Sequence, residues 1–255
     1  MKHSVTALLL ALTLPVISCS GKTVLGVTGS EKTSVRTTTT SGTASDIRKV
    51  EASGVVDVIY TQYAGTASYT VTCPEEYSDN LVVNVSGNKI KVYIKDGVKN
   101  RNDTDPKVTL NLKSAGITDI ELSGVSCFTT DWLDMTGQDV EIDLSGVSSV
   151  KIDSLTAAEV DVEVSGAGGF NCTRLIADYG ELEASGASGI NVENGDFKTV
   201  KLSVSGASGA TMGGTAETGI FQSSGASRID VGKMKVTQSS VNSSGVSSIT
   251  SPKKK

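Results

Sequence analysis

The chain has 255 residues and a formal net charge of -5, with a sequence pI near 5.0. This acidic balance argues against nucleic acid as a partner, because phosphate backbones are recognised through clustered Lys and Arg. The single histidine, His3, lies in an N-terminal segment that reads as a cleaved signal. The mature chain would therefore have no histidine base, no histidine metal ligand and no Ser-His-Asp triad. We predict a non-enzymatic protein without a cofactor.

Residues 1–18 are predicted to be a lipoprotein signal peptide. Lys2 supplies a positive start, an apolar run follows from Ala7 to Leu14, and Ser18 precedes Cys19. The apolar run is too short to cross a bilayer as a helix. Its ending resembles the lipobox of bacterial lipoproteins, and this resemblance implies a mature chain that begins at a diacylated Cys19 carrying palmitate-like chains. The alternative is an ordinary cleaved signal with a chance cysteine.

This anchor would place the chain at the outer membrane. The residues after Cys19 lack the acidic cluster associated with export to the cell surface. The choice between the periplasmic side and the cell surface therefore stays open. Residues 19–46 are rich in Thr, Ser and Gly and poor in large apolar side chains, which predicts a flexible tether because burial cannot offset the entropy of ordering them.

Residues 47–113 are predicted to form an N-terminal β capping region. Apolar and polar residues alternate with the period of two that is typical of strands in five segments: 50–60, 69–72, 81–85, 89–94 and 108–112. Gly87 and Asn88 between two such segments indicate a tight hairpin, and residues 100–106 indicate an exposed loop. We expect these strands to cover the open edge of the repeats that follow.

Residues 114–251 carry a repeat with a period near twenty. A Ser-Gly pair followed by Val or Ala recurs with spacings of 22, 20, 20, 20, 19 and 20 residues. The seven motif serines are Ser123, Ser145, Ser165, Ser185, Ser205, Ser224 and Ser244. A fixed short period is the signature of a solenoid, in which each unit buries its apolar face against the next. The remaining residues, 252–255, form a basic tail.

Aligning the repeats on the serine shows which positions face inward. Apolar residues occupy fixed positions three residues before the serine and five and seven after it, and polar residues alternate with them. This is the pattern of strands with one buried face. The glycine after each serine indicates a tight corner. Cys172 falls in an inward column, and coils stacked about 4.8 Å apart leave it too far from Cys127 for a disulfide. Trp132, beside the insertion in the first repeat, is expected to pack at the cap; the alternative is a local bump formed with Met135.

The chain resembles a known family. The segment Val50 to Tyr60, the hairpin at Asn88, Pro106 leading into Val108 and the repeated Leu-Ser-Gly-Val-Ser units are similar to the auto-transporter adhesin head domain family, called the GIN domain. The likeness covers residues 47–251. It implies an all-β fold, a right-handed parallel β-helix with an N-terminal β-sheet cap, in a secreted or lipid-anchored bacterial protein. It transfers no catalytic or ligand-binding residue.

Eight carboxylates form the main candidate surface. They stand two and four residues before successive motif serines, where the alternation points them outward on one wall. They are Asp119, Glu121, Glu141, Asp143, Asp161, Glu163, Glu181 and Glu183. Their repulsion could be offset by calcium or by a basic partner. Alternatively, they form a solvated face that keeps the protein soluble. The serine columns could bind sugars, or they could satisfy local backbone groups.

We therefore predict a lipid-anchored cell-envelope protein that presents its β-helix as a non-enzymatic binding or adhesion surface. The ligand, a glycan or a protein, is not identified by the sequence, and neither is the oligomeric state. One alternative is a structural or regulatory periplasmic lipoprotein. Another is a β-helix enzyme acting on polysaccharides, which the short and uniform coils make less favourable because such enzymes need long loops around a groove.

Overall fold

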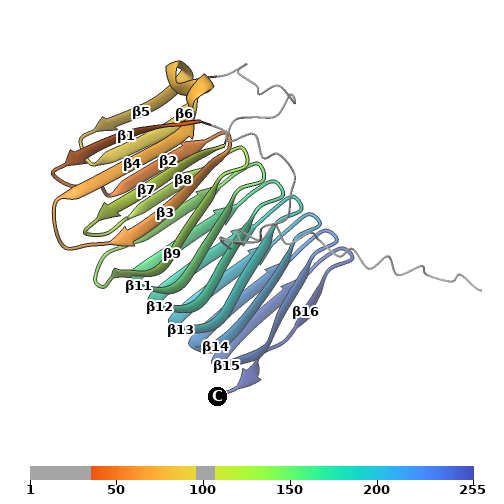
Figure 1. Cartoon of the computed structure of the whole chain (residues 1–255). Coiled ribbons are helices and arrows are strands. Elements are labelled where there is room, and N and C mark those ends of the chain that lie inside the picture. Colours follow the sequence, from red (N-terminus) through yellow and green to blue (C-terminus); the bar gives the residue numbers. More distant parts are fainter. Residues whose placement is uncertain (1–35, 96–106) are drawn as a thin grey trace, which may run out of the picture.

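The computed structural model describes residues 36–95 and 107–255 (Figure 1). The predicted signal peptide, Cys19 and the predicted loop at residues 100–106 lie outside the described residues. Within them, no helix combines the length and the hydrophobicity needed to cross a bilayer.

Almost all regular structure in the described residues is β. The N-terminal elements are β1 (Thr37–Ala44), β2 (Lys49–Ser53), β3 (Val56–Gln62), β4 (Ala67–Pro74), the 3-10 helix η1 (Glu75–Asn80), β5 (Leu81–Ser86), β6 (Lys89–Ile94) and β7 (Val108–Ser114). The repeats form β8 (Asp119–Leu122), β9 (Cys127–Met135), β10 (Val140–Leu144), β11 (Ser149–Val164), β12 (Gly169–Ala184), β13 (Gly189–Val204), β14 (Gly209–Ser223), β15 (Arg228–Ser243), β16 (Ser248–Thr250) and β17 (Lys253–Lys254).

The repeats form a β-solenoid of about seven turns with coils of about twenty residues, which confirms the predicted fold class. Strands β11 to β15 are 15 or 16 residues long and each pairs in parallel with the same strand of the next coil. The register matches equivalent repeat positions, so Val150 lies beside Phe170 and Phe170 beside Ile190. Figure 1 shows these strands stacked along one axis.

The Ser-Gly motif is the corner of each coil. Gly146, Gly166 and Gly186 have φ angles of 69°, 86° and 78°, a region that L-residues with side chains rarely adopt. A Cβ on Gly186 would lie 2.6 Å from the carbonyl oxygen of Gly166 in the coil below. The backbones approach closely because this carbonyl accepts a hydrogen bond of 2.7 Å from the N–H of Ala187. The repeated glycine is therefore required by stacking.

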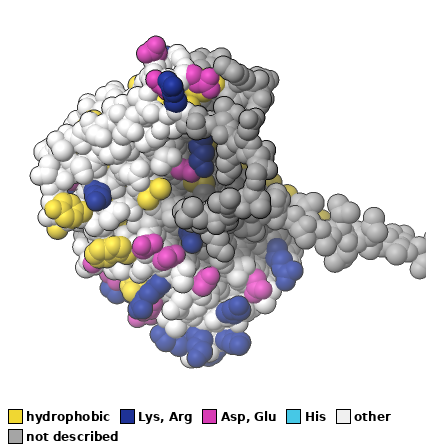
Figure 2. All heavy atoms as spheres, viewed as in Figure 1, with side chains coloured by type: hydrophobic (Ala, Val, Ile, Leu, Met, Phe, Trp, Pro, Cys, Tyr) yellow, Lys and Arg dark blue, Asp and Glu magenta, His cyan; other side chains and the backbone are white. Residues whose placement is uncertain are grey.

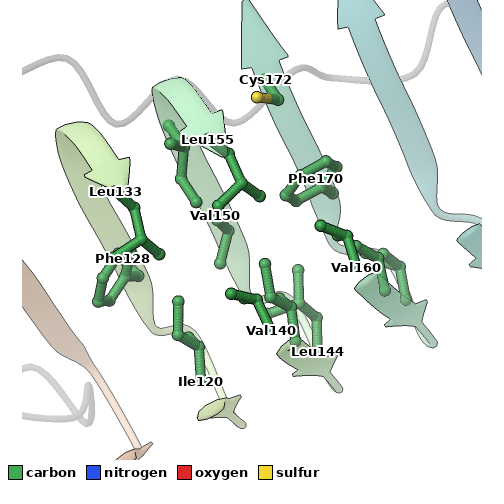
Figure 3. Close-up of a cluster of buried hydrophobic side chains, with 14 of the residues drawn as sticks. Ile120, Phe128, Leu133, Val140, Leu144, Val150, Leu155, Val160, Phe170 and Cys172 are labelled. Atoms are coloured by element: carbon green, nitrogen blue, oxygen red, sulfur yellow. The ribbon is translucent and has the colours of Figure 1, made fainter. Parts of the chain in front are cut away.

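The inward columns form one continuous core. Figure 3 shows Phe128, Val150 and Phe170 from successive coils pointing into the same interior. Cys172 lies in that interior as a free, buried thiol, as predicted, and burial raises its pKa to about 12. The column three residues before the serine is buried in every coil except the last, where Val241 is 42% exposed.

The N-terminal region is built around an additional corner at Ser53 and Gly54. The segment predicted as one strand from Val50 to Tyr60 is split there into β2 and β3, which pair in parallel with β8 and β9. Strands β4, β5, β6 and β7 are inserted between this corner and the first repeat and complete a nearly closed sheet. The predicted hairpin is present, with Ser86 opposite Lys89 in β5 and β6.

The predicted tether is corrected at its C-terminal end. Within residues 19–46, residues Thr37–Ala44 form β1, which pairs antiparallel with β4 along its whole length. The side chains of β1 are mostly exposed, so its order comes from backbone pairing with a formed neighbour and from β-branched Thr residues that favour extended structure. A prediction of order from buried apolar area alone therefore misses a strand of this kind.

Candidate functional site: the acidic wall

The eight predicted carboxylates lie together on one face of the solenoid, which we call the acidic wall. Four form a row in the order Asp119, Glu141, Asp161 and Glu181, and four form a parallel row in the order Glu121, Asp143, Glu163 and Glu183. Each row crosses β8, β10, β11 and β12 with equivalent residues directly paired. All eight side chains are exposed or half-buried, as their alternation with core residues requires.

A lysine forms an ion pair with a carboxylate at each end of the acidic wall. The sequence pattern did not predict these ion pairs. At the C-terminal end, Lys201 of β13 forms ion pairs with Glu181 and, at 3.5 Å, with Glu183. At the N-terminal end, Lys49 of β2 lies 2.5 Å from Asp119. Glu51 extends the second row by one coil, because it pairs with Glu121 in the β2–β8 register.

The negative charge of Glu51 is neutralised by two lysines. Its carboxylate forms ion pairs with Lys89 and Lys91, both on β6. Desolvation opposes ionisation of Glu51, but hydrogen bonds from these two lysines outweigh it and hold its pKa below the usual value. The pKa of Glu181 is likewise lowered, first by the hydrogen bond from Lys201 and then by one from Tyr179.

The centre of the wall lacks such compensation. Asp143 and Asp161 make no ion pair among the described residues. Partial desolvation raises the pKa of both, and repulsion from neighbouring carboxylates adds to the shift. For Asp143 the strongest repulsion comes from Glu163, and for Asp161 from Glu181. Negative charge without a paired cation is therefore concentrated on the two central coils, which contain β10 and β11.

The wall is not arranged as a metal centre. Within residues 36–95 and 107–255, no group of three or more His, Cys, Asp or Glu side chains is placed to hold a metal ion. Calcium needs six to eight converging oxygens, whereas carboxylates on a flat parallel sheet point outward side by side. This geometry favours contact with an extended cationic or hydroxyl-rich partner over a single bound ion.

Two shallow grooves follow the junction between the acidic wall and the Ser-Gly corners. One, of about 290 Å³, is lined by Glu121, Asp143 and Glu163 together with the motif serines Ser123, Ser145 and Ser165. The other, of about 240 Å³, continues past Glu183 and Ser185 toward Ser244. Together they place a carboxylate row beside a hydroxyl row along the solenoid axis. Another depression, of about 430 Å³, lies over the first row between Asp119 and Glu181.

The serine columns divide into two kinds. Several hydroxyls three residues after the motif serine are buried and donate to backbone carbonyls, such as Ser188 to Ser185 at 2.7 Å and Ser227 to Ser224 at 2.6 Å. They hold the corner, as the structural interpretation predicts. Ser148 at the same position is buried without a hydrogen-bond partner among the described residues. The motif serines are more exposed, although Ser165 donates to the Leu144 carbonyl at 3.2 Å. The motif serines line both grooves, joined in the second groove by Ser203 and Ser223.

Two exposed aromatic side chains lie near the boundary between the N-terminal sheet and the first repeat. Trp132 is 53% exposed, so the expectation that it packs at the cap is wrong, whereas Leu133 and Met135 on the same strand are buried. Tyr63 is also exposed, and the adjoining Gln62 is hydrogen-bonded to both backbone groups of Asp134. The repeat pattern did not predict these exposed aromatic side chains, because the insertion in the first repeat interrupts the alternation of buried and exposed positions.

The largest depression described lies on another face and is lined mainly by small residues. It measures about 720 Å³ and runs over the positions that follow the corners, including Ala167, Gly189 and Ala210. Asn171 and Asn191, paired in the β12–β13 register, stand at its side. Its lining offers little charge.

Known proteins resemble this chain in sequence profile and in fold. The sequence profile described as "Putative auto-transporter adhesin, head GIN domain" matches residues 46–174. A search of curated protein sequences finds no match to the chain.

Solved structures share the fold. A putative adhesin from Bacteroides fragilis is 24% identical, with a TM-score of 0.71, and the alignment covers 88% of this chain and 99% of that one. A putative lipid binding protein from Parabacteroides distasonis is 18% identical with a TM-score of 0.65, covering 86% and 97%. A putative adhesin from the same species is 18% identical with a TM-score of 0.64, covering 83% and 97%. At these identities the likeness establishes the fold alone.

Proposed function

The chain belongs to the auto-transporter adhesin head (GIN) domain family, and from this premise we propose that it is a lipid-anchored cell-envelope protein whose solenoid is a non-enzymatic adhesion surface. Cys19 is the proposed lipid attachment site at the outer membrane. The acidic wall and the grooves beside it are the proposed contact surface for a glycan or protein ligand.

The observation that carries the proposal is the register of the wall. Carboxylates repeat in straight rows across four paired strands, and the N–H of the motif serine that follows each strand bonds to a backbone carbonyl of the preceding coil. A polymeric ligand can therefore make the same contact once per coil. Each exposed contact is weak, because surface charge pairs contribute only about 0.2 to 1 kcal/mol. Several contacts made by one ligand act together through their high effective concentration.

The same geometry supports a non-enzymatic role. The grooves along the wall are shallow, with volumes of about 240 and 290 Å³. Catalytic carboxylate pairs normally hold a substrate between them in a closed site, with one pKa raised and one left low. Here the pKa values of both Asp143 and Asp161 are raised, and the two residues stand on neighbouring coils in different rows of an open surface.

Protease accessibility on cells tests the location. Digestion of the protein on intact cells is the expected result for an adhesin. Digestion only after permeabilisation would overturn the adhesion proposal and favour the periplasmic alternative. Metabolic labelling with a palmitate analogue, compared between the native chain and Cys19→Ser, tests the anchor; equal labelling of both would refute acylation at Cys19.

A binding assay with matched charge variants tests the wall. The triple variant Glu121→Gln, Asp143→Asn, Glu163→Gln removes three central carboxylates. The control removes three exposed carboxylates elsewhere: Asp153→Asn, Glu193→Gln, Glu217→Gln. Adhesion to immobilised glycans or host proteins should fall in the first variant only. An equal fall in both would mean that net charge, and not the wall, governs attachment.

A further inference from the structure

Charge is distributed very unevenly along the solenoid. Residues 115–223 contain 17 Asp and Glu against four Lys and Arg, whereas residues 224–255 contain one Asp against six Lys and Arg. All these residues lie in the described part of the chain. The sequence predicts only a basic tail at residues 252–255. The structure shows that this tail joins other cations at one end of the molecule.

Five lysines form this group, which we call the lysine cluster. They are Lys233 and Lys235 of β15, Lys253 and Lys254 of β17, and Lys255. Strand β17 returns to pair in parallel with β15, which places Lys253 directly beside Lys235. The N–H of Lys255 bonds to the carbonyl of Val236 at 3.1 Å and fixes the tail there. All five side chains are exposed. Figure 2 shows Lys and Arg gathered at the lower end of the face, where Figure 1 places β15.

The cluster has no internal compensation. Among the described residues, none of its lysines forms an ion pair with a carboxylate, in contrast to Lys49, Lys198 and Lys201. Asp230 is the one carboxylate in residues 224–255, and it accepts a hydrogen bond from the N–H of Gly232. Like charges paired directly across strands are unfavourable, so the arrangement of Lys235 and Lys253 favours an external anion.

The same end exposes apolar side chains. Val241, which continues a buried column, is 42% exposed, and Val246 at the last corner is 89% exposed. Residues 237–251 contain no charged side chain. The end face therefore combines lysines on one side with uncharged polar and apolar residues on the rest. Surfaces that rest on membranes combine basic residues with apolar ones in this way.

We propose that the C-terminal end of the solenoid docks on a lipid membrane through the lysine cluster, which binds anionic phosphate headgroups. A cluster of four to eight basic residues is the usual size of an anionic lipid site. Lysines suit a diffuse layer of phosphates, because each is a flexible point charge, whereas recognition of one carboxylate or phosphate group favours the planar fork of arginine.

The acidic wall orients this contact without opposing it. Glu183 of β12 lies three coils from β15, which is about 14 Å at a strand spacing of about 4.8 Å. This exceeds the Debye length of about 8 Å at physiological ionic strength. In this pose the wall and the membrane therefore repel each other little. A pose with the acidic wall itself against the anionic membrane would bring these carboxylates within a Debye length of it, and repulsion would disfavour that pose. The contact is independent of lipid attachment at Cys19.

Sedimentation with lipid vesicles tests the proposal. All proteins are full-length and carry Cys19→Ser, so that no acyl chain contributes, and the N-terminal segment is common to all. Binding is measured to phosphatidylcholine vesicles and to the same vesicles containing phosphatidylglycerol. The test variant is Lys235→Gln, Lys253→Gln, and the control with the same charge change is Lys151→Gln, Lys198→Gln. Thermal melting followed by circular dichroism verifies that each variant is folded.

The expected result is binding only to the anionic vesicles, weakened by added salt. Each lysine near such a surface is worth about fivefold in affinity, so the test variant should bind roughly 25-fold more weakly and the control almost normally. Equal binding to both vesicle types, or an equal loss in both variants, would overturn the proposal. So would salt-sensitive sedimentation without vesicles, which would assign the cluster to the acidic wall of a second copy. Aggregation of the test variant while the parent ignores both vesicles would mean that the lysines only protect a strand edge.

Discussion

The two ends of this solenoid protect their exposed strand edges in different ways. A stack of parallel coils leaves an unpaired strand edge and an open core at each end. At the N-terminal end, an inserted set of strands covers the first coil, and β1 adds a further strand to the sheet beside β4. At the C-terminal end, the last coil instead loses its apolar residues, so residues 237–246 are exposed and largely uncharged.

This difference shows that the end of a solenoid can be protected by additional packed strands or by a last coil made of polar residues. The N-terminal cap contains buried, specific contacts: Tyr60 stacks on Phe128 at 5.8 Å, and its hydroxyl donates to the Ser114 carbonyl at 2.9 Å. The C-terminal coil makes few such contacts, because Ser243 replaces the apolar residue before the motif and Val241 is partly exposed. We expect the N-terminal end to resist perturbation through packing and the C-terminal end to tolerate substitution.

The largest expected effect concerns the corner glycines. Gly54 and Gly186 share a positive φ, at 90° and 78°, but a Cβ on Gly54 would meet nothing within 4 Å, whereas on Gly186 it would lie 2.6 Å from the Gly166 carbonyl oxygen. Gly54→Ala should therefore cost only the backbone strain, about 1 to 2 kcal/mol. Gly186→Ala adds the displacement of a neighbouring coil, about 1 to 3 kcal/mol more.

Urea unfolding of both variants measures the difference. Gly54→Ala is the control, because it carries the same conformational strain without the clash. Equal losses of unfolding free energy would show that the glycines are needed for φ alone and that coil-to-coil approach plays no part.

A smaller effect separates the interior from the C-terminal coil at one repeat position. Val162 and Val241 both stand three residues before a motif serine, but Val162 is 0% exposed and Val241 is 42% exposed. Val162→Ala removes two buried methyl groups and should cost about 2 kcal/mol. The same substitution at Val241 should cost well under 1 kcal/mol, since part of its surface already contacts water. Comparable losses would mean that residues 237–243 are covered in solution, by a partner or by a second copy.

The repeat made the interior of this fold predictable. Inward columns, corner glycines and the outward direction of the eight carboxylates all follow from a period of two within a period of twenty, because stacked coils place equivalent residues side by side. The position of Cys172 as a buried thiol follows from the same columns.

Features created by sequence-distant pairing were not predictable in this way. The first corner at Gly54 stands 70 residues before that at Gly124, so its membership in the stack is visible only in the β2–β8 pairing. The ion pair of Lys49 with Asp119 and the approach of Lys253 to Lys235 have the same origin. Each depends on which strand returns to which edge, and periodicity does not encode that choice.

The buried tyrosine of the N-terminal cap gives a prediction of intermediate size. Tyr60→Phe keeps the ring on Phe128 but removes the hydroxyl that donates to the Ser114 carbonyl and accepts from the Ser114 hydroxyl at 3.3 Å. Unfolding free energy should fall by about 1 kcal/mol, the usual net value of a buried neutral hydrogen bond. Tyr63→Phe, at an exposed tyrosine of the same region, is the control and should change stability little. Loss of stability in the control instead would contradict the assignment of the hydrogen bond to Tyr60.

The smallest expected effect has opposite signs at the centre and at the end of the acidic wall. The pKa of Asp161 is raised above its ordinary value of 3.8, so its ionisation is harder in the folded state than in the unfolded state. Its contribution is absent below the unfolded pKa and becomes destabilising as pH rises through the folded pKa. The pKa of Glu181 is lowered from 4.5 by Lys201 and Tyr179. Its contribution is stabilising above the unfolded pKa and is lost as pH falls through the folded pKa.

Asp161→Asn should therefore stabilise the protein at pH 7, and Glu181→Gln should destabilise it, each by about 0.5 kcal/mol because both sites are largely solvated. The Asp161→Asn difference should shrink as pH falls through the ordinary Asp value of 3.8, and the Glu181→Gln difference should shrink as pH falls through the lowered folded pKa of Glu181. The Asp161→Asn gain should also shrink in high salt. Thermal melting across this pH range measures them. Stabilisation by both variants would mean that Lys201 does not offset the repulsion it faces, and that the acidic wall is strained at its end as well as at its centre.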